Sequence, residues 1–281
     1  MNRLSRRGLA AASALLPVAA LIGQAHAQSS GTESALDRVQ RTKTLRISAL
    51  PGAAPYFAKD LASGTWKGAC VEMAADIAKV FDAKVEYVEG TYASSVLDLQ
   101  SNKVDLAFAL NPTPARALAI NFTHSFITHP FGCIAKAGFS PKTWDDLNKP
   151  EIRIACDVGS LHEVAARRYC PKAQITALKT PDEATLFFQS GRADAFILAA
   201  MLGLSALAKN PSMGRYELLS GPVVALPSNF GVRREADTRF VEVINAWIDF
   251  NRGTGQVREY LLDGLALNGV TRDMLPAGLT F

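Results

Sequence analysis

Two side chains that can hold an anion lie three residues apart, just after a short apolar run. The segment of residues 101–123 reads SNKVDLAFALNPTPARALAINFT. Its apolar part, Leu106–Leu110, predicts a strand, and the proline-bracketed loop that follows carries Thr113 and Arg116. A guanidinium matches a carboxylate with two parallel hydrogen bonds, and a nearby hydroxyl can add another. We therefore expect this loop to grip one anionic group of a small molecule.

The elements around this loop alternate between predicted strands and predicted helices in two similar sets. Period-two or continuous apolar runs predict strands, and apolar residues at helical spacing predict helices. This alternation is typical of an α/β fold, a sheet covered by helices. The predicted strands cover residues 44–49, 84–88, 104–110, 152–156, 174–178 and 193–198, and the predicted helices cover residues 70–81, 94–100, 160–169, 181–190, a segment ending at 209, 237–252 and 255–262.

Two extended segments connect the two sets. Residues 131–136 lead from the first set to the second, and residues 223–232 lead back. We therefore predict two lobes, each a sheet flanked by helices, joined by a two-strand hinge. Residues 28–130 and 228–281 form lobe 1 in this prediction, and residues 131–227 form lobe 2. A cleft between two such lobes is the expected place for a ligand.

The N-terminus has the pattern of an export signal. Residues 1–7 hold three arginines and no acid, residues 8–22 are apolar, and Ala25-His26-Ala27 is a small-x-small cleavage site. The pattern predicts cleavage after Ala27 and a periplasmic mature chain. Both the general secretory route and the twin-arginine route fit the arginines. An uncleaved anchor is the alternative, although the apolar run is short for a bilayer.

Composition narrows the possible partners. The formal net charge is +4 at pH 7 and falls by three, to +1, when the leader arginines are removed. The sequence has no basic run interleaved with aromatic residues, so nucleic acid is disfavoured as a partner. A small-molecule solute is therefore the expected partner, with no cofactor and no metal.

Four cysteines remain in the mature chain: Cys70, Cys133, Cys156 and Cys170. In an oxidising compartment they can pair, and four cysteines allow three full pairings. Cys156 and Cys170 fall in one predicted strand–helix unit, which favours one bridge within lobe 2. The alternative is four buried thiols that act as small hydrophobic side chains.

The order of several short motifs resembles the periplasmic solute-binding proteins of family 3, the polar amino acid type. The resemblance includes the block at residues 101–123, Ala54-Pro55-Tyr56, the Gly191–Ala195 stretch GRADA and Gly231-Val232-Arg233. It covers nearly the whole mature chain. It implies the two-lobed type II periplasmic binding protein fold and a monomer. It also implies a protein that traps a solute and delivers it to an inner-membrane ABC permease.

The resemblance also implies ligand contacts. Family members hold a ligand carboxylate with the arginine that matches Arg116, and Thr113 matches the motif threonine. Asn111 stands where relatives carry a serine or threonine, and its amide can replace that hydroxyl. Helix capping by Arg116 and turn formation by Thr113 are the structural alternatives. The full candidate set is Arg116, Thr113, Asn111, Ser160, Gly159 and Tyr56.

The pair Gly159-Ser160 resembles the family's Gly-Thr/Ser turn at the start of a helix. Backbone N–H groups and the hydroxyl at such a turn can bind an anion. Ser160 and Glu163 also fit a capping box, which is the structural alternative. The two roles are compatible. If both hold, a carboxylate is gripped from both lobes, and binding is coupled to closure.

Three departures from the family pattern change the expected ligand. Ala199 stands where the resemblance places the aspartate that binds the ligand ammonium, while Leu50 and Ala53 replace another acid and a stacking aromatic. A buried ammonium without a counter-charge costs several kcal/mol. We therefore predict a small anionic or carboxylate-bearing solute rather than an ordinary α-amino acid, unless Glu72 or Asp157 supplies the missing charge.

Two other functions are also compatible with the sequence. Some relatives with this fold, the cyclohexadienyl dehydratases, are exported lyases, and here Asp157, His162 or Glu163 could act as the acid. An accessory protein of a periplasmic redox pathway is the third possibility. The spacings of His124, His129 and Cys133 invite a metal interpretation. On an extended chain, however, residues 124 and 129 face opposite sides.

Overall fold

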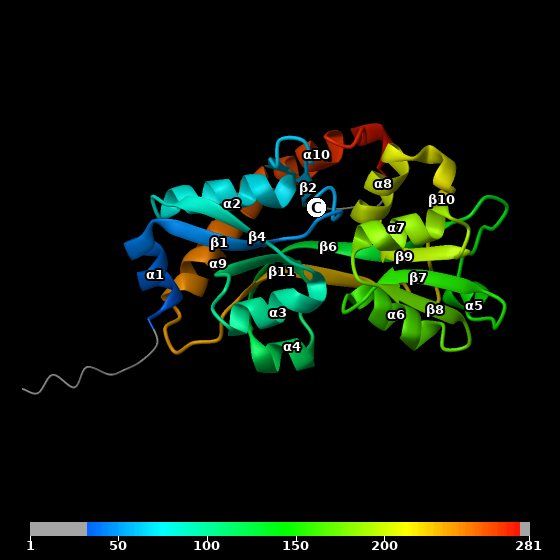
Figure 1. The fold of residues 1–281 in the computed structure, drawn as a ribbon, viewed down its shortest axis with the longest axis horizontal. Helices are drawn as coiled ribbons and strands as arrows, with labels where there is room; N and C mark the ends of the chain where they lie inside the picture. The colour runs from blue at the N-terminus through cyan, green and yellow to red at the C-terminus, as the bar shows by residue number, and fades with distance from the viewer. Residues whose placement is uncertain (1–32, 276–281) are drawn as a thin grey trace, which may run out of the picture. The chain divides into compact units, whose positions relative to one another are not determined.

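The computed structural model describes residues 33–275, so the predicted signal segment of residues 1–27 lies outside the described residues. Figure 1 shows the order of the elements. The helices are α1 Ala35–Thr42, α2 Ala69–Val80, α3 Tyr92–Gln100, α4 Pro114–Ala119, α5 Trp144–Leu147, α6 Leu161–Tyr169, α7 Pro181–Gln189, α8 Ala200–Lys209, α9 Arg239–Gly253 and α10 Gln256–Ala266. The strands are β1 Thr44–Ala49, β2 Ala58–Lys59, β3 Trp66–Lys67, β4 Lys84–Glu89, β5 Leu106–Leu110, β6 Asn121–Ala135, β7 Arg153–Asp157, β8 Gln174–Leu178, β9 Ala195–Ala199, β10 Arg215–Leu218 and β11 Ala225–Val232.

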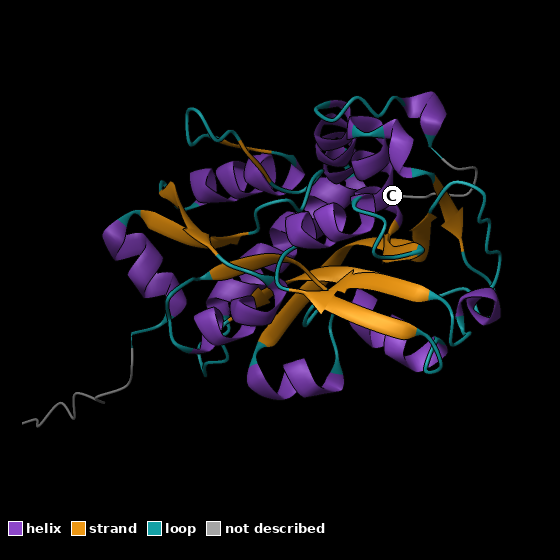
Figure 2. Cartoon of the chain, turned by 45° about the vertical axis from the view of Figure 1, so that its right-hand side comes forward, coloured by secondary structure: helices purple, strands orange, loops and turns teal. Residues whose placement is uncertain are grey.

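The strands of the described residues form one nine-stranded sheet and a small β2–β3 hairpin. The order along the large sheet is β4-β1-β5-β11-β6-β9-β7-β8, and β10 pairs with β6. Helices cover both faces: α2 lies on one side of β1 and β4, and α3 and α4 lie on the other (Figure 1). Figure 2 shows the strands in the interior with helices around them. The predicted α/β class, a sheet flanked by helices, is confirmed.

The long strand β6 joins the two halves of the sheet. Its first part pairs with β11, as Pro130 does with Ala225, and its last five residues pair with β9, starting with Phe131 and Ala199. The predicted first crossing is therefore the second part of a longer strand. The predicted return crossing is confirmed as β11, which runs antiparallel to both β5 and β6.

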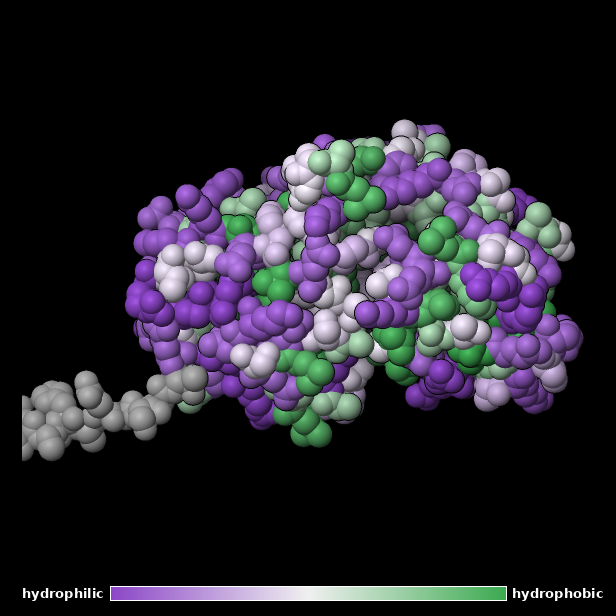
Figure 3. All heavy atoms as spheres, viewed as in Figure 1, coloured by the Kyte–Doolittle hydropathy of each residue, from purple (hydrophilic) through white to green (hydrophobic). Residues whose placement is uncertain are grey.

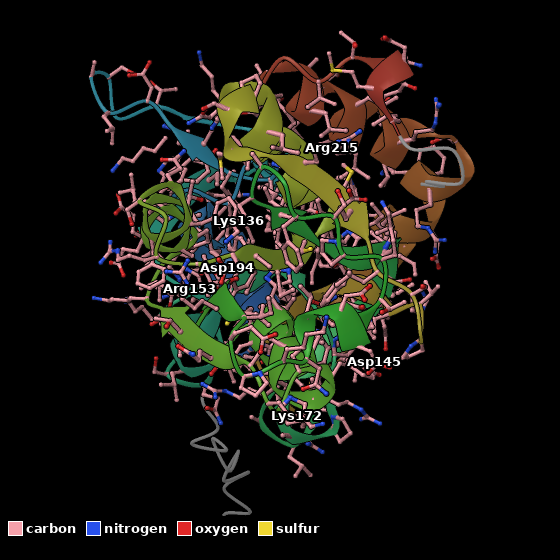
Figure 4. All side chains as sticks on the ribbon, turned by 90° about the vertical axis from the view of Figure 1, so that its right-hand side faces the viewer. Lys136, Asp145, Arg153, Lys172, Asp194 and Arg215 are labelled. Atoms are coloured by element: carbon pink, nitrogen blue, oxygen red, sulfur yellow. The ribbon has the colours of Figure 1, made fainter. Side chains whose placement is uncertain are left out.

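The two halves repeat one ion-pair arrangement at the start of a central strand. In the first half, Asp105 accepts a hydrogen bond from the N–H of Arg46 at 2.8 Å and returns its own N–H to the Arg46 carbonyl. In the second half, Asp194 and Arg153 make the same two bonds, the first at 2.9 Å. Figure 4 shows Lys136, Asp194 and Arg153 next to one another. This repetition explains why the sequence divides into two similar sets.

All four cysteines are buried and unpaired, so the expected disulfide is absent from the structure. The Cys156 thiol lies 3.9 Å from the Thr176 carbonyl, whereas the Cys170 thiol lies 3.6 Å from the Trp144 carbonyl. The two thiols therefore have different neighbours. Burial raises the pKa of both to about 12. The alternative of buried hydrophobic thiols describes these side chains, and none is an exposed redox group.

The face of the molecule seen in Figure 3 is mostly polar. No helix within residues 33–275 has both the length and the apolar composition that a bilayer crossing needs. Figure 3 shows an apolar area over α3 and α4, the helices that carry the exposed side chains of Leu97 and Leu118. Buried apolar side chains of both sheet halves form one connected core.

Candidate functional site

Arg116 lies on a helix, not on the loop that the sequence predicted. Thr113 caps α4 by accepting the N–H of Arg116 at 3.1 Å, and Pro114 occupies the first helical position. Proline is favoured there because that position needs no N–H donor. The Thr113 hydroxyl is thus used by the helix cap, a local role that differs from the turn formation named as the alternative.

The Arg116 guanidinium links the two halves of the sheet. Its Nη1 donates to the Asn111 carbonyl at 2.9 Å, and its Nη2 donates to the Gly159 carbonyl at 2.6 Å. These bonds use two of the five N–H groups of the guanidinium. Burial lowers the pKa of Arg116, while the nearby Asp157 carboxylate acts in the opposite direction. Three donors therefore remain for an anion that reaches the guanidinium.

The turn before α6 uses its polar groups locally. The Ser160 hydroxyl accepts the N–H of Glu163 at 3.2 Å and donates to the Asp157 carbonyl at 2.7 Å. Gly159 donates its N–H to Oε2 of Glu163 at 2.8 Å. Its φ of +73° is a left-handed conformation, and an added Cβ would lie 2.8 Å from Cβ of Ala93. The N-cap predicted for Ser160 is confirmed, but the capping box is not, because Glu163 accepts the N–H of Gly159 and not that of Ser160. The N–H groups that start α6 remain for an anion.

A small cavity lies between α4, α6 and the strand ends, and we call it the Arg116 cavity. Its volume is about 10 Å³. Four candidate residues line it: Tyr56, Asn111, Arg116 and Ser160. Gly159 is not a lining residue, but its carbonyl accepts a hydrogen bond from Arg116. The complete lining is Tyr56, Tyr92, Ala109, Asn111, Arg116, His129, Ser160, Leu161, His162, Ala199, Leu202 and Ser228.

The described residues that line the Arg116 cavity include a positive charge and no negative charge. Among its lining residues, all within residues 33–275, there is one arginine and no carboxylate. Ala199 lines the cavity where the resemblance places the ammonium-binding aspartate, and its N–H donates to Nε2 of His162 at 3.2 Å. The space beside Ala199 is therefore occupied by an imidazole that accepts a hydrogen bond, not by an acid.

His129 is a site residue that the sequence did not place at the ligand site. Its Nδ1 lies 3.1 Å from the Tyr56 hydroxyl, and its Nε2 lies 3.4 Å from the Ser228 hydroxyl. Asn111 donates to Ser228 at 3.2 Å, which extends this buried chain of polar groups. His124 lies on the opposite, exposed side of β6 and pairs with Asp249, as the alternation predicts. Alternation along β6 is the signal that could have placed His129 inside.

The pairing of Asp157 with His162 was also not predicted from the sequence. Nδ1 of His162 lies 2.8 Å from Oδ1 of Asp157, and both side chains are buried. Because Nε2 accepts the N–H of Ala199, Nδ1 carries the proton and donates it to the carboxylate. Both ring nitrogens are thus engaged within the protein. Among residues 33–275 no group of three potential metal ligands occurs, so the metal interpretation gains no support.

Burial of His129 predicts a pH-dependent stability. Desolvation, followed by the nearby His162, lowers the pKa of His129 from 6.5 to about 3. The unfolded chain therefore binds a proton below pH 6.5 while the folded chain does not, and stability falls as the pH decreases. From pH 7 to pH 5 we expect this residue to remove about 2 kcal/mol from the free energy of unfolding. Urea unfolding at both pH values measures it.

The control for this effect is His129→Gln, which keeps a polar side chain but does not titrate. The loss of stability between pH 7 and pH 5 should be smaller in the variant by about the same 2 kcal/mol. Equal losses in both proteins would show that His129 is readily protonated in the folded state.

Two sheet halves joined by crossing strands, with a cavity at their contact that carries a cation, define a two-lobed solute-binding protein with the type II periplasmic binding protein fold. The chain belongs to the bacterial extracellular solute-binding proteins, family 3, because the model of that family matches residues 45–262. The predicted family is therefore confirmed.

Two of the similar proteins are a cyclohexadienyl dehydratase and an ancestral precursor of such an enzyme. The chain is 28% identical over 176 residues to the cyclohexadienyl dehydratase of Pseudomonas aeruginosa, a match that covers 60% of this chain and 64% of that protein. The ancestral amino acid-binding protein AncCDT-1, described as a precursor of cyclohexadienyl dehydratase, is 27% identical with a TM-score of 0.73. That match covers 82% of this chain and 98% of the ancestral one.

Structural similarity also holds at lower identity. An amino acid ABC transporter substrate-binding protein from Streptococcus pneumoniae, solved with L-arginine bound, has a TM-score of 0.77 at 18% identity. The match covers 83% of this chain and 99% of that one. This likeness shows the shared fold.

Proposed function

We propose that the protein captures a small carboxylate-bearing solute between its two lobes and that the solute is not an ordinary α-amino acid. The observation that carries this proposal is the lining of the Arg116 cavity, with one guanidinium and no carboxylate among its residues. The solute carboxylate binds the free N–H groups of Arg116 and the first N–H groups of α6, those of Leu161 and His162. The anion is then held from both sides of the cleft.

The same lining disfavours an α-ammonium. In an α-amino acid the ammonium lies two bonds from the carboxylate carbon, so both charges would enter the Arg116 cavity together. The ammonium would meet Ala199 and the ring of His162, which already donates one proton and accepts another. An unpaired buried charge costs several kcal/mol.

The wider role follows from the family. We propose that residues 28–130 and 228–281 form lobe 1 and that residues 131–227 form lobe 2. The partner change of β6 between Pro130 and Phe131 supports this boundary. We further propose a monomer, exported after cleavage behind Ala27, that delivers its solute to an ABC permease in the inner membrane.

A thermal-shift screen of the mature protein tests the ligand class. We expect organic acids that lack an α-ammonium to raise the melting temperature. A ligand that binds the folded protein, here through the N–H groups of Arg116 and α6, and not the unfolded chain stabilises the fold. The common α-amino acids should leave it unchanged. The opposite pattern, stabilisation by α-amino acids and not by organic acids, would refute the proposed ligand class. Native mass spectrometry of freshly purified protein identifies a solute that the protein retains.

An exported lyase is the second candidate. The buried Asp157–His162 pair beside the cavity and the similarity to cyclohexadienyl dehydratase favour it. Against it, both nitrogens of His162 are engaged, and Glu163 is held by Gly159 and Arg167. Turnover of prephenate or arogenate by the purified protein would establish a lyase, whereas binding of a carboxylate without turnover supports the receptor.

A further inference from the structure

A second cavity lies beside the Arg116 cavity, and we call it the Asp157 cavity. Its volume is about 150 Å³. Leu202 lines both cavities. The buried part of the lining is apolar apart from two residues. The remaining lining residues are exposed or half-buried, and they include the charged side chains of Asp182 and Lys209. The buried lining residues are Ala54, Asp157, Phe196, Leu198, Leu202 and Ser205.

Two buried polar atoms on the lining residues have no hydrogen-bond partner. They are Oδ2 of Asp157 and Oγ of Ser205, two of only three such side-chain atoms within residues 33–275. The Asp157 side chain is 4% exposed, and Ser205 is 1% exposed. Buried polar atoms are normally bonded, so each of these two oxygens lacks a donor that a bound group can supply.

The Asp157 carboxylate is held in a fixed orientation. Its Oδ1 accepts the Nδ1 proton of His162, whose Nε2 accepts the N–H of Ala199. This leaves Oδ2 as the open position. A carboxylate oxygen together with a hydroxyl suits an ammonium, which brings three donors and a positive charge. The apolar side chains of Phe196, Leu198 and Leu202 suit a hydrocarbon chain next to that ammonium.

We propose that the Asp157 cavity binds the ammonium of the solute whose carboxylate is held by Arg116. The solute is then an amino acid in which a chain of methylene groups separates the amine from the carboxylate. This inference rests on the proposed function, since it needs a carboxylate at Arg116. The two sites are adjacent, because His162, which lines the Arg116 cavity, donates to Oδ1 of Asp157 at 2.8 Å. Leu202, shared by both cavities, contacts the chain between the ends.

Isothermal titration calorimetry with a set of small acids tests the inference. The probes are β-alanine, 4-aminobutanoate, 5-aminopentanoate and 6-aminohexanoate, with pentanoate, glutarate and L-alanine as comparisons. We expect one of the ω-amino acids to bind at least about tenfold more tightly than pentanoate and L-alanine, because only it supplies a charge-assisted bond at each end. Glutarate should bind more weakly than pentanoate, since its second carboxylate would face that of Asp157.

Variants separate the ammonium site from the carboxylate site. Asp157→Asn keeps an acceptor for His162 and removes the charge, so we expect about a tenfold or greater loss for the ω-amino acid. Pentanoate should bind equally well or slightly more tightly, because a negative charge near its carboxylate is removed. Ser205→Ala should weaken the ω-amino acid a few-fold. Asp182→Asn, on an exposed residue of the same lining, is the matched control and should change neither affinity by more than about twofold.

The outcomes distinguish this inference from the proposed function. If Arg116-dependent binding of pentanoate persists while Asp157→Asn leaves ω-amino acid binding unchanged, or glutarate binds best, the ammonium site is refuted and the carboxylate site stands. If no acid binds in an Arg116-dependent way, both fail. Should Asp157→Asn unfold, a crystal structure with the tightest ω-amino acid decides, because the ammonium must then contact Oδ2 of Asp157 and not solvent.

Discussion

Replacing Arg116 with alanine will lower the affinity for the carboxylate solute by about a hundredfold or more. The side chain supplies the one positive charge among the lining residues of the Arg116 cavity, all of which lie within residues 33–275. Charge-assisted hydrogen bonds contribute about 1.5–3 kcal/mol each, and the guanidinium can make two to one carboxylate. A loss of about 3 kcal/mol corresponds to about a hundredfold in affinity. Calorimetric titration with the stabilising acid from the thermal-shift screen measures the effect.

Two further variants show whether the loss of affinity comes from the planar donor groups of the guanidinium or from its charge. Arg116→Lys keeps the charge but not the planar donors, so we expect an intermediate loss of about tenfold. Arg234→Ala is the matched control, because Arg234 donates to the carbonyls of Ala117 and Leu118 on the same helix but lies outside the cavity lining. Binding by Arg116→Ala within about threefold of the natural protein would place the anion elsewhere.

Replacing Asp105 with alanine will destabilise the fold by about 3–5 kcal/mol, the largest loss of stability that we expect from one surface-distant polar substitution. Its carboxylate is fully buried and accepts bonds from Arg38 and Arg46, including Nε of Arg38 at 2.9 Å and Nη2 of Arg46 at 2.7 Å. Without Asp105, two largely buried guanidinium groups lose their counter-charge. Urea unfolding at neutral pH measures the change in the free energy of unfolding.

The second half of the sheet contains a matched control. Asp194 makes the same bonds to Arg153, but the side chains of Arg153 and Lys136 are 40% and 52% exposed. Water can replace the lost partner of these cations, so Asp194→Ala should cost only about 1–2 kcal/mol. Equal losses for Asp105→Ala and Asp194→Ala would show that burial of the cations does not set the stability of this motif.

Much of the fold could be predicted because its strands and helices carry strong local signals. The strands β1 and β8 begin and end where the apolar pattern places them, and α6 begins after the capping residue Ser160. The helix α4 was missed although Thr113 and Pro114 form a typical helix start. Its six residues bury no side chain, so no apolar periodicity marked it. The full length of β6 was missed because the change of partner strand is a tertiary property.

The site was predicted only in part. Arg116 and Asn111 both line the cavity. Asn111 follows β5 directly, whereas Arg116 reaches the cavity from α4, a helix that the apolar pattern did not reveal. The chain of contacts through His129 joins residues that are 73 and 99 positions apart, so no local pattern could indicate it. The unpartnered oxygen of Asp157 depends in the same way on the packing of α6 against β9.

In this structure the Arg116 guanidinium already spans the cleft through its bond to the Gly159 carbonyl. A solute carboxylate that binds the same guanidinium therefore adds to, or replaces, an existing contact between the two halves. The affinity then reflects the exchange of a neutral acceptor for a charged one, which favours the carboxylate.

The most direct test of the central claim is a crystal structure of the protein with the solute that it retains on purification. We predict a carboxylate whose oxygens lie within about 3 Å of the Arg116 guanidinium and of the N–H groups that start α6. We also predict no α-ammonium in the Arg116 cavity. A solute bound elsewhere while Arg116 keeps only its carbonyl partners, or an ordinary α-amino acid bound in this cavity, would refute the proposed ligand site.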